Sequence, residues 1–119
     1  MLRVLTAIAA LFGCAGLMLA AAAAHVAPGA SLDAAGNMLL FHAPAVIAAC
    51  CAIAAGLVNR RLGIAAAILL LAGAALFSGD LALRAYAGQR LFPMAAPTGG
   101  ATMMVGWVLL AIAAFVPKR

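Results

Sequence analysis

The sequence predicts an all-α integral membrane protein with four transmembrane helices in one compact antiparallel bundle. Of its 119 residues, 70% are hydrophobic and 8% are charged, and the mean hydropathy of +1.27 is well above that of ordinary soluble domains. The hydrophobic residues form four nearly uncharged blocks, each close to the roughly 20 residues that a helix needs to cross a bilayer. We predict one domain, residues 1–119, with helices over residues 4–24, 38–58, 62–83 and 99–116.

The distribution of charge predicts the orientation of these helices. The net charge is +5, which in a soluble protein would favour a nucleic-acid partner. Here the basic residues stand at the ends of the apolar blocks, so we expect them to be topology signals and expect no nucleic acid. In a chain with four spans, the N-terminus, the second connection and the C-terminus lie on the same side of the membrane. These segments carry five basic residues: Arg3, Arg60, Arg61, Lys118 and Arg119. The excess over Arg84 and Arg90 on the other side predicts that both termini are cytoplasmic.

The first block carries small residues three or four apart, a spacing that lets helices approach closely in lipid. They are Ala9, Gly13, Gly16, Ala20 and Ala24. The alternative is a cleaved signal peptide, because the alanines before His25 imitate a cleavage site. The apolar run is about 20 residues long, whereas the apolar region of a signal peptide is usually 7–15 residues. We therefore expect the first helix to be retained.

The second and third helices are predicted to be antiparallel neighbours, because residues 59–61 leave room only for a short turn. Residues 25–37 are predicted to be a polar loop, so the second helix is expected to begin near Met38. Pro44 should kink this helix and free the carbonyl of Leu40, for which His42 is a nearby donor.

The fourth helix is predicted to begin with Thr98 as its N-cap. Trp107 lies well inside that helix, where it is expected to pack against a neighbouring helix. Three cysteines within predicted spans are expected to be packing residues rather than a disulfide framework: Cys14, Cys50 and Cys51. The glycines expected at helix contacts are Gly13, Gly16, Gly79, Gly99, Gly100 and Gly106.

Polar residues within or beside the spans are predicted to gather near the outer membrane surface. We name this set the outer polar layer: His25, His42, Ser78, Asp80, Arg84 and Thr98. An ionisable group inside a span is costly unless it is paired, and Asp80 and Arg84 are four residues apart, as in an ion pair along a helix.

Three interpretations of the outer polar layer remain open. Its histidines could donate hydrogen bonds to Asp80 or to freed carbonyls and so join the helices. The layer could instead bind a proton or a substrate. A two-histidine, one-carboxylate metal site could form from His25, His42 and Asp80, although no local metal motif supports it. Without a nucleophilic constellation or metal spacing, we expect no enzyme and no cofactor.

Short motifs along the chain resemble a known family. They are the small residues ending in His25, the pair Phe41–His42, the run Leu76–Gly79, Pro97–Gly100, and Gly106–Trp107. In this order they resemble the DUF 423 family of small bacterial membrane proteins, which is itself similar to eukaryotic transmembrane protein 256. In that family Ser-Leu-Tyr commonly follows the Ser-Gly of the third helix, where this chain has Asp80-Leu81-Ala82.

The resemblance implies a four-span protein of the bacterial inner membrane without an established biochemical role. We expect a non-catalytic protein that helps to assemble or stabilise a membrane complex. Its expected partners are the lipid bilayer and another membrane protein or a second copy. The alternative is a small transporter or permease subunit that uses the outer polar layer.

Overall fold

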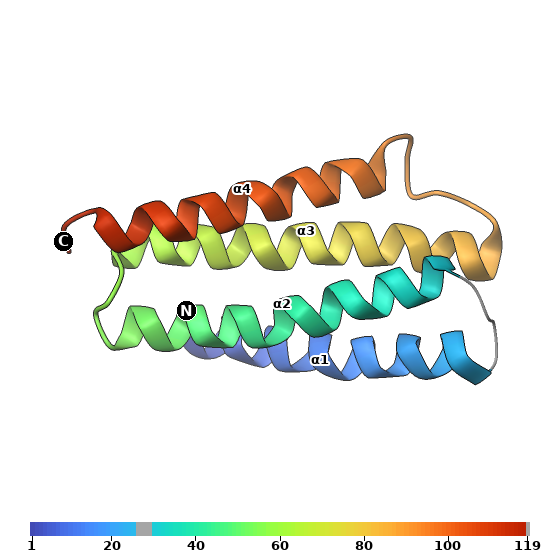
Figure 1. Cartoon of the computed structure of the whole chain (residues 1–119), viewed down its shortest axis with the longest axis horizontal. Helices are drawn as coiled ribbons and strands as arrows, with labels where there is room; N and C mark the ends of the chain where they lie inside the picture. The colour runs from blue at the N-terminus through green and yellow to red at the C-terminus, as the bar shows by residue number, and fades with distance from the viewer. Residues whose placement is uncertain (26–29, 119) are drawn as a thin grey trace.

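The structure, a computed structural model, describes residues 1–25 and 30–118 of the chain. Its four helices run antiparallel along a long axis of 47 Å (Figure 1). They are α1 (Leu2–His25), α2 (Ala30–Ala54), α3 (Arg60–Ala87) and α4 (Ala95–Phe115). All four are long and apolar enough to cross a membrane. The predicted all-α architecture with four such helices is therefore confirmed.

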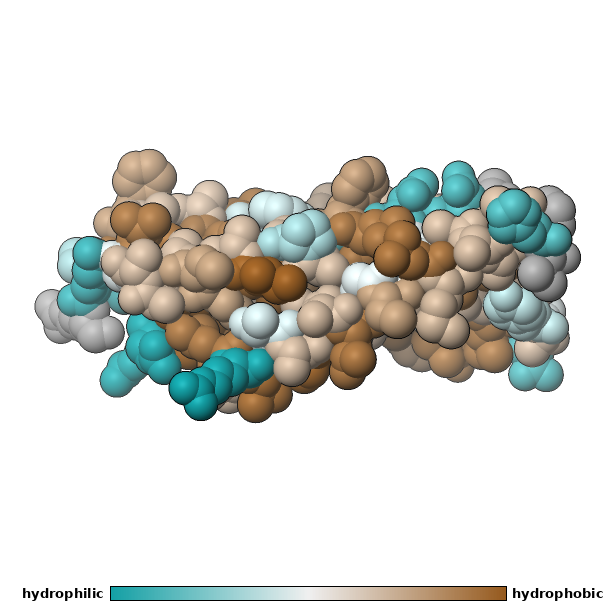
Figure 2. All heavy atoms as spheres, turned by 90° about the horizontal axis from the view of Figure 1, so that it is seen from below, coloured by the Kyte–Doolittle hydropathy of each residue, from teal (hydrophilic) through white to brown (hydrophobic). Residues whose placement is uncertain are grey.

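Each helix packs chiefly on its neighbours in the chain, in the order α1, α2, α3 and α4. Figure 1 shows α1 and α4 on opposite sides of the inner pair. In the most apolar part of each helix, 39% of the residues of α2 and 44% of those of α3 are buried, against 17% for α1 and 22% for α4. The two outer helices therefore leave most of their apolar surface uncovered. Figure 2 shows one such largely apolar face, with hydrophilic side chains gathered toward its ends.

The predicted bounds of the second helix were wrong. α2 begins at Ala30 rather than near Met38 and ends at Ala54, after which Gly56 adopts a positive φ of 70°. The turn-forming residues before Met38 are helical because this segment packs against its neighbours, with Leu32 and Ala35 buried. Of the predicted loop, residues 26–29 lie outside the described residues.

The predicted start of the fourth helix was also wrong. α4 begins at Ala95, and its N-cap is Met94 in a left-handed conformation without a capping side chain. Thr98 is already helical, and its backbone N–H donates to the carbonyl of Met94 over 2.9 Å. Pro97 fits the first turn, where the amide that it lacks has no helical acceptor.

Glycines allow the helix backbones to touch at two crossings. In the α3–α4 crossing, a Cβ atom on Gly99 would lie 2.6 Å from the backbone nitrogen of Phe77, and one on Gly73 would lie 2.7 Å from the carbonyl oxygen of Gly99. In the α1–α2 crossing, a Cβ atom on Gly36 would lie 3.0 Å from the backbone nitrogen of Ala20. Such contacts are how helices associate in lipid, where burial of apolar surface drives little packing.

Three of the six glycines predicted at helix contacts, Gly16, Gly99 and Gly106, lie at tight contacts. An added Cβ at Gly13 or Gly79 would make only an ordinary contact, 3.5 Å from Ala43 or 3.8 Å from Leu91. The prediction for Gly100 was wrong, because a Cβ there would meet nothing within 4 Å. Three further glycines, which were not predicted, are tightly packed: Gly36, Gly63 and Gly73.

We predict that Gly99→Ala destabilises the protein by about 1–3 kcal/mol, the usual cost of overpacking. The added methyl group would collide with the backbone of α3. The matched control is Gly100→Ala, which gains the same helix propensity next to open space and should be neutral or slightly stabilising. Reversible unfolding in mixed detergent micelles measures both. Equal stabilities for the two variants would contradict the close approach of α3 and α4.

Candidate functional site

The residues of the predicted outer polar layer make separate contacts rather than one cluster. Ser78, Asp80 and Arg84 lie in the last third of α3. Because α2 begins at Ala30, His42 lies near the middle of its helix rather than one turn below the surface. His25 ends α1 and is exposed, and Thr98 is exposed in the first turns of α4. The structure therefore divides the predicted set into separate contacts.

Asp80 is the most deeply buried of these residues, with 0% of its surface exposed. One carboxylate oxygen accepts a hydrogen bond from Arg84 Nη2 over 2.6 Å, in the predicted ion pair along the helix. The other oxygen accepts from the backbone N–H of Leu91 over 2.9 Å. Leu91 belongs to the connection between α3 and α4, so this single carboxylate ties that connection back onto α3.

Ser78 joins two helices. Ser78 is 2% exposed, and its hydroxyl donates to the carbonyl of Ala35 on α2 over 2.8 Å. The carbonyl of Ala35 lies in the segment that had been predicted to be a loop. The hydroxyl thus bonds α3 to the first part of α2, and its hydrogen is not available to a ligand in this arrangement.

His42 joins α2 to α4 through Trp107. The indole Nε1–H of Trp107 donates to His42 Nε2 over 3.2 Å, and the two rings meet edge to face with centroids 5.9 Å apart. An indole nitrogen can only donate, so His42 Nε2 must be unprotonated. His42 Nδ1 then carries the hydrogen and donates to the carbonyl of Met38 over 2.8 Å. Both ring nitrogens are therefore satisfied, but not by Asp80 or by the carbonyl of Leu40, the two predicted acceptors.

The structure does not bring together the three residues of the alternative metal site. His25 is exposed at the end of α1, His42 bonds to Met38 and Trp107, and Asp80 bonds to Arg84 and Leu91. Within residues 1–25 and 30–118, no group of three or more histidine, cysteine or acidic side chains could hold a metal ion. The three cysteines, which all lie within the described residues, are free thiols. Cys50 is buried, and Cys14 and Cys51 are exposed.

Asn59, which sequence analysis treated only as a turn residue, makes the main polar contact at the other end of the molecule. Its side-chain oxygen caps α3 by accepting from the N–H groups of Arg61 and Leu62 over 3.1 Å each. Its side-chain nitrogen donates to the carbonyl of Pro117 over 2.8 Å, and its backbone N–H donates to Ala113. An asparagine directly before a helix was the available signal, since asparagine is a favoured N-cap residue.

Two apolar grooves run along α2. The first lies between α1 and α2 and has a volume of about 430 Å³. The second lies between α2 and α4, has a volume of about 460 Å³, and is lined mostly by alanines together with Trp107. Both grooves lie along apolar faces of the chain, away from Asp80 and Arg84. A smaller cavity of about 190 Å³ is lined by Ser78 together with apolar side chains of α1, α2 and α3.

Four helices of this length and apolarity indicate a multi-pass membrane protein. The hydrogen bonds of Ser78 and His42 described above join its helices. The chain belongs to the family described as "Protein of unknown function (DUF423)", whose model matches residues 19–100. That range contains all the motifs of the predicted resemblance except Gly106–Trp107. No curated protein and no solved structure matches the chain.

We predict that Asn59→Ala lowers the free energy of unfolding by about 0.5–2 kcal/mol, the range for loss of a side-chain N-cap. The substitution removes the cap of α3 and the bond to Pro117. Asn37→Ala is the matched control, because Asn37 is exposed on α2. Unfolding in mixed micelles measures both variants, and an unchanged Asn59→Ala protein would contradict the assigned role.

We also predict a favourable coupling between His42 and Trp107 in a double-mutant cycle. Trp107→Phe removes the donor while keeping a ring, and His42→Leu removes the acceptor. Interhelical hydrogen bonds in membranes average about 0.6 kcal/mol and reach about 1.7 kcal/mol, so the coupling should fall in this range. Strictly additive effects of the two substitutions on unfolding would show that the bond contributes nothing.

Proposed function

We propose that this protein is a non-catalytic integral membrane protein that assembles with, or stabilises, another membrane protein. The observation that carries the proposal is the use of its buried polar side chains. Asp80, Ser78 and His42 each bond to groups of the chain itself, on other helices or on the connection before α4. A binding or catalytic site would instead leave such costly groups free to meet a ligand.

The outward side of α4 is the face that we propose for the partner. Its exposed large side chains recur at helical spacing: Met104, Val105, Val108, Ile112 and Phe115. Gly100 adds open space for a close approach by another helix. Trp107 is 46% exposed near the middle of α4, although tryptophan favours the membrane interface. The bond to His42 holds the indole there, and a second protein would cover the part of the ring that is exposed.

The proposal includes a location in the bacterial inner membrane with both termini in the cytoplasm. One end of the molecule supports this orientation. The contacts of Asn59 hold the α2–α3 turn against the end of α4, and Leu2 packs beside Ile53 and Ala113 there. The basic residues at this end are those that the positive-inside rule assigns to the cytoplasm.

The transporter alternative depends on Asp80 as a proton or substrate ligand. The complete burial of this carboxylate and its two donors favour a structural role instead. A pH-dependent flux in proteoliposomes that disappears in Asp80→Asn, with an equal amount of folded protein reconstituted, would favour transport over assembly.

We predict that Gly100→Trp abolishes a larger complex in mild-detergent extracts of native membranes without lowering the amount of the protein. The new side chain enters open space, so it should block a partner while sparing the fold. Leu11→Trp is the matched control on the exposed face of α1 and should leave the complex intact. Native gel electrophoresis of the tagged full chain measures both. A wild-type protein that migrates only as a monomer would overturn the proposal.

A further inference from the structure

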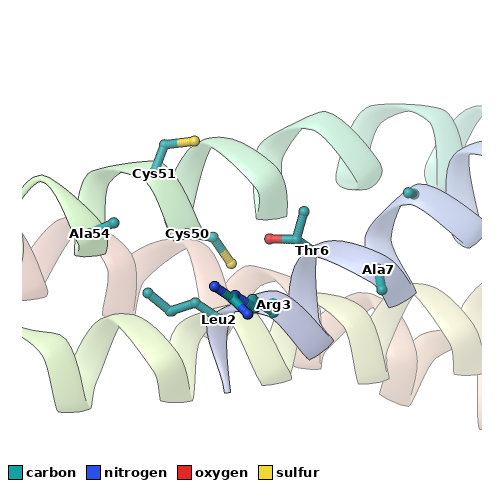
Figure 3. A pocket seen from close by; sticks show the side chains of 8 residues that line it. Leu2, Arg3, Thr6, Ala7, Cys50, Cys51 and Ala54 are labelled. Atoms are coloured by element: carbon teal, nitrogen blue, oxygen red, sulfur yellow. The ribbon is translucent and has the colours of Figure 1, made fainter.

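The groove between α1 and α2 combines an apolar trough with a cation. Its walls include Arg3, Thr6, Ala7 and Ala10 of α1 and Cys50 and Ala54 of α2. Its volume of about 430 Å³ falls within the range of about 300–1,000 Å³ typical of small-molecule sites. Figure 3 shows the hydroxyl of Thr6 and the sulfur of Cys50 turned toward the space between the two helices, with Arg3 beside them.

The polar groups of this groove have no partners within the described residues. Neither the guanidinium of Arg3 nor the hydroxyl of Thr6 forms a hydrogen bond or ion pair with residues 1–25 or 30–118. The two side chains are three positions apart and therefore share one face of α1. Arg3 is exposed, so its charge is free to meet a ligand at the mouth of the groove.

The charge around the groove is of one sign. The groove lies near the end of the molecule that carries the exposed cations Arg3, Arg60, Arg61 and Lys118. Both acidic residues belong to the other end, Asp33 in the first turn of α2 and Asp80 in the last third of α3. The groove is thus an apolar trough beside a cluster of positively charged side chains.

We propose that the α1–α2 groove binds a phospholipid with an anionic headgroup. The phosphate would meet the planar guanidinium of Arg3, which suits bidentate contact with phosphate oxygens, and would accept from the Thr6 hydroxyl. One acyl chain would lie along Ala7 and Ala10, which leave the trough open because their side chains are small. The α2–α4 groove differs because no charged residue lines it.

Native mass spectrometry of the purified full chain in non-ionic detergent tests the proposal, with phosphatidylglycerol and phosphatidylcholine of identical acyl chains as probes. We expect tighter binding of phosphatidylglycerol. Arg3→Gln should weaken it about five-fold, the effect of one basic residue at an anionic membrane surface. Arg90→Gln is the matched control, since it removes one exposed cation from the opposite end and should leave binding unchanged.

A second pair of variants tests the trough itself. Ala10→Phe should fill the groove and weaken binding, whereas Ala21→Phe, at an exposed position farther along α1, should not. Equal binding of the two lipids, or equal losses of lipid affinity in Arg3→Gln and Arg90→Gln, would overturn the proposal. Either result would show that the protein attracts lipids without a specific site at the groove. A dimer of the wild-type chain that Ala10→Phe dissociates, with lipid binding unchanged, would overturn it in favour of a second copy in the groove.

Discussion

The buried carboxylate of Asp80 is the interaction on which one end of this molecule depends. A carboxylate without water or a partner costs several kcal/mol, so the chain must supply its donors. Arg84 supplies a charged donor one turn later on α3, and the backbone of Leu91 supplies a second from the following connection. This pairing holds the connection beside α3, and α4 begins only four residues after Leu91. The requirement to satisfy one charge therefore helps to set where the last helix starts.

The lipid environment explains the contacts between the helices. In lipid, apolar side chains gain little by leaving one hydrocarbon environment for another, so close packing and hydrogen bonds must hold helices together. The α3–α4 pair uses the contact of Gly73 with Gly99, and the α2–α3 pair adds the bond from Ser78 to Ala35. The opposite end uses Asn59 to join the α2–α3 turn to the end of α4. Because α1 packs chiefly on α2 and α4 chiefly on α3, the other faces of these two outer helices remain open to lipid or to a partner.

Sequence reasoning predicted the features that depend on local order along the chain. The number of helices follows from the length of the apolar blocks, and the pair of Asp80 with Arg84 follows from their spacing. Contacts between helices were not predictable, because the rotation and register of each helix decide which groups meet. Thus His42 bonds to Trp107, 65 residues away, rather than to its predicted acceptors. The start of α2 was missed because packing overrides the turn preference of residues 31–37.

The central claim is that the buried polar side chains hold the helices together rather than serve a ligand. The most direct test compares the membrane abundance and unfolding stability of Asp80→Asn with those of Asp33→Asn, in which an exposed acid on α2 is changed. Breaking a buried pair typically costs about 3–5 kcal/mol, so the account predicts strong depletion of Asp80→Asn and a normal level of Asp33→Asn. Equal abundance and stability of the two variants would contradict it, since Asp80 would then be dispensable for the fold.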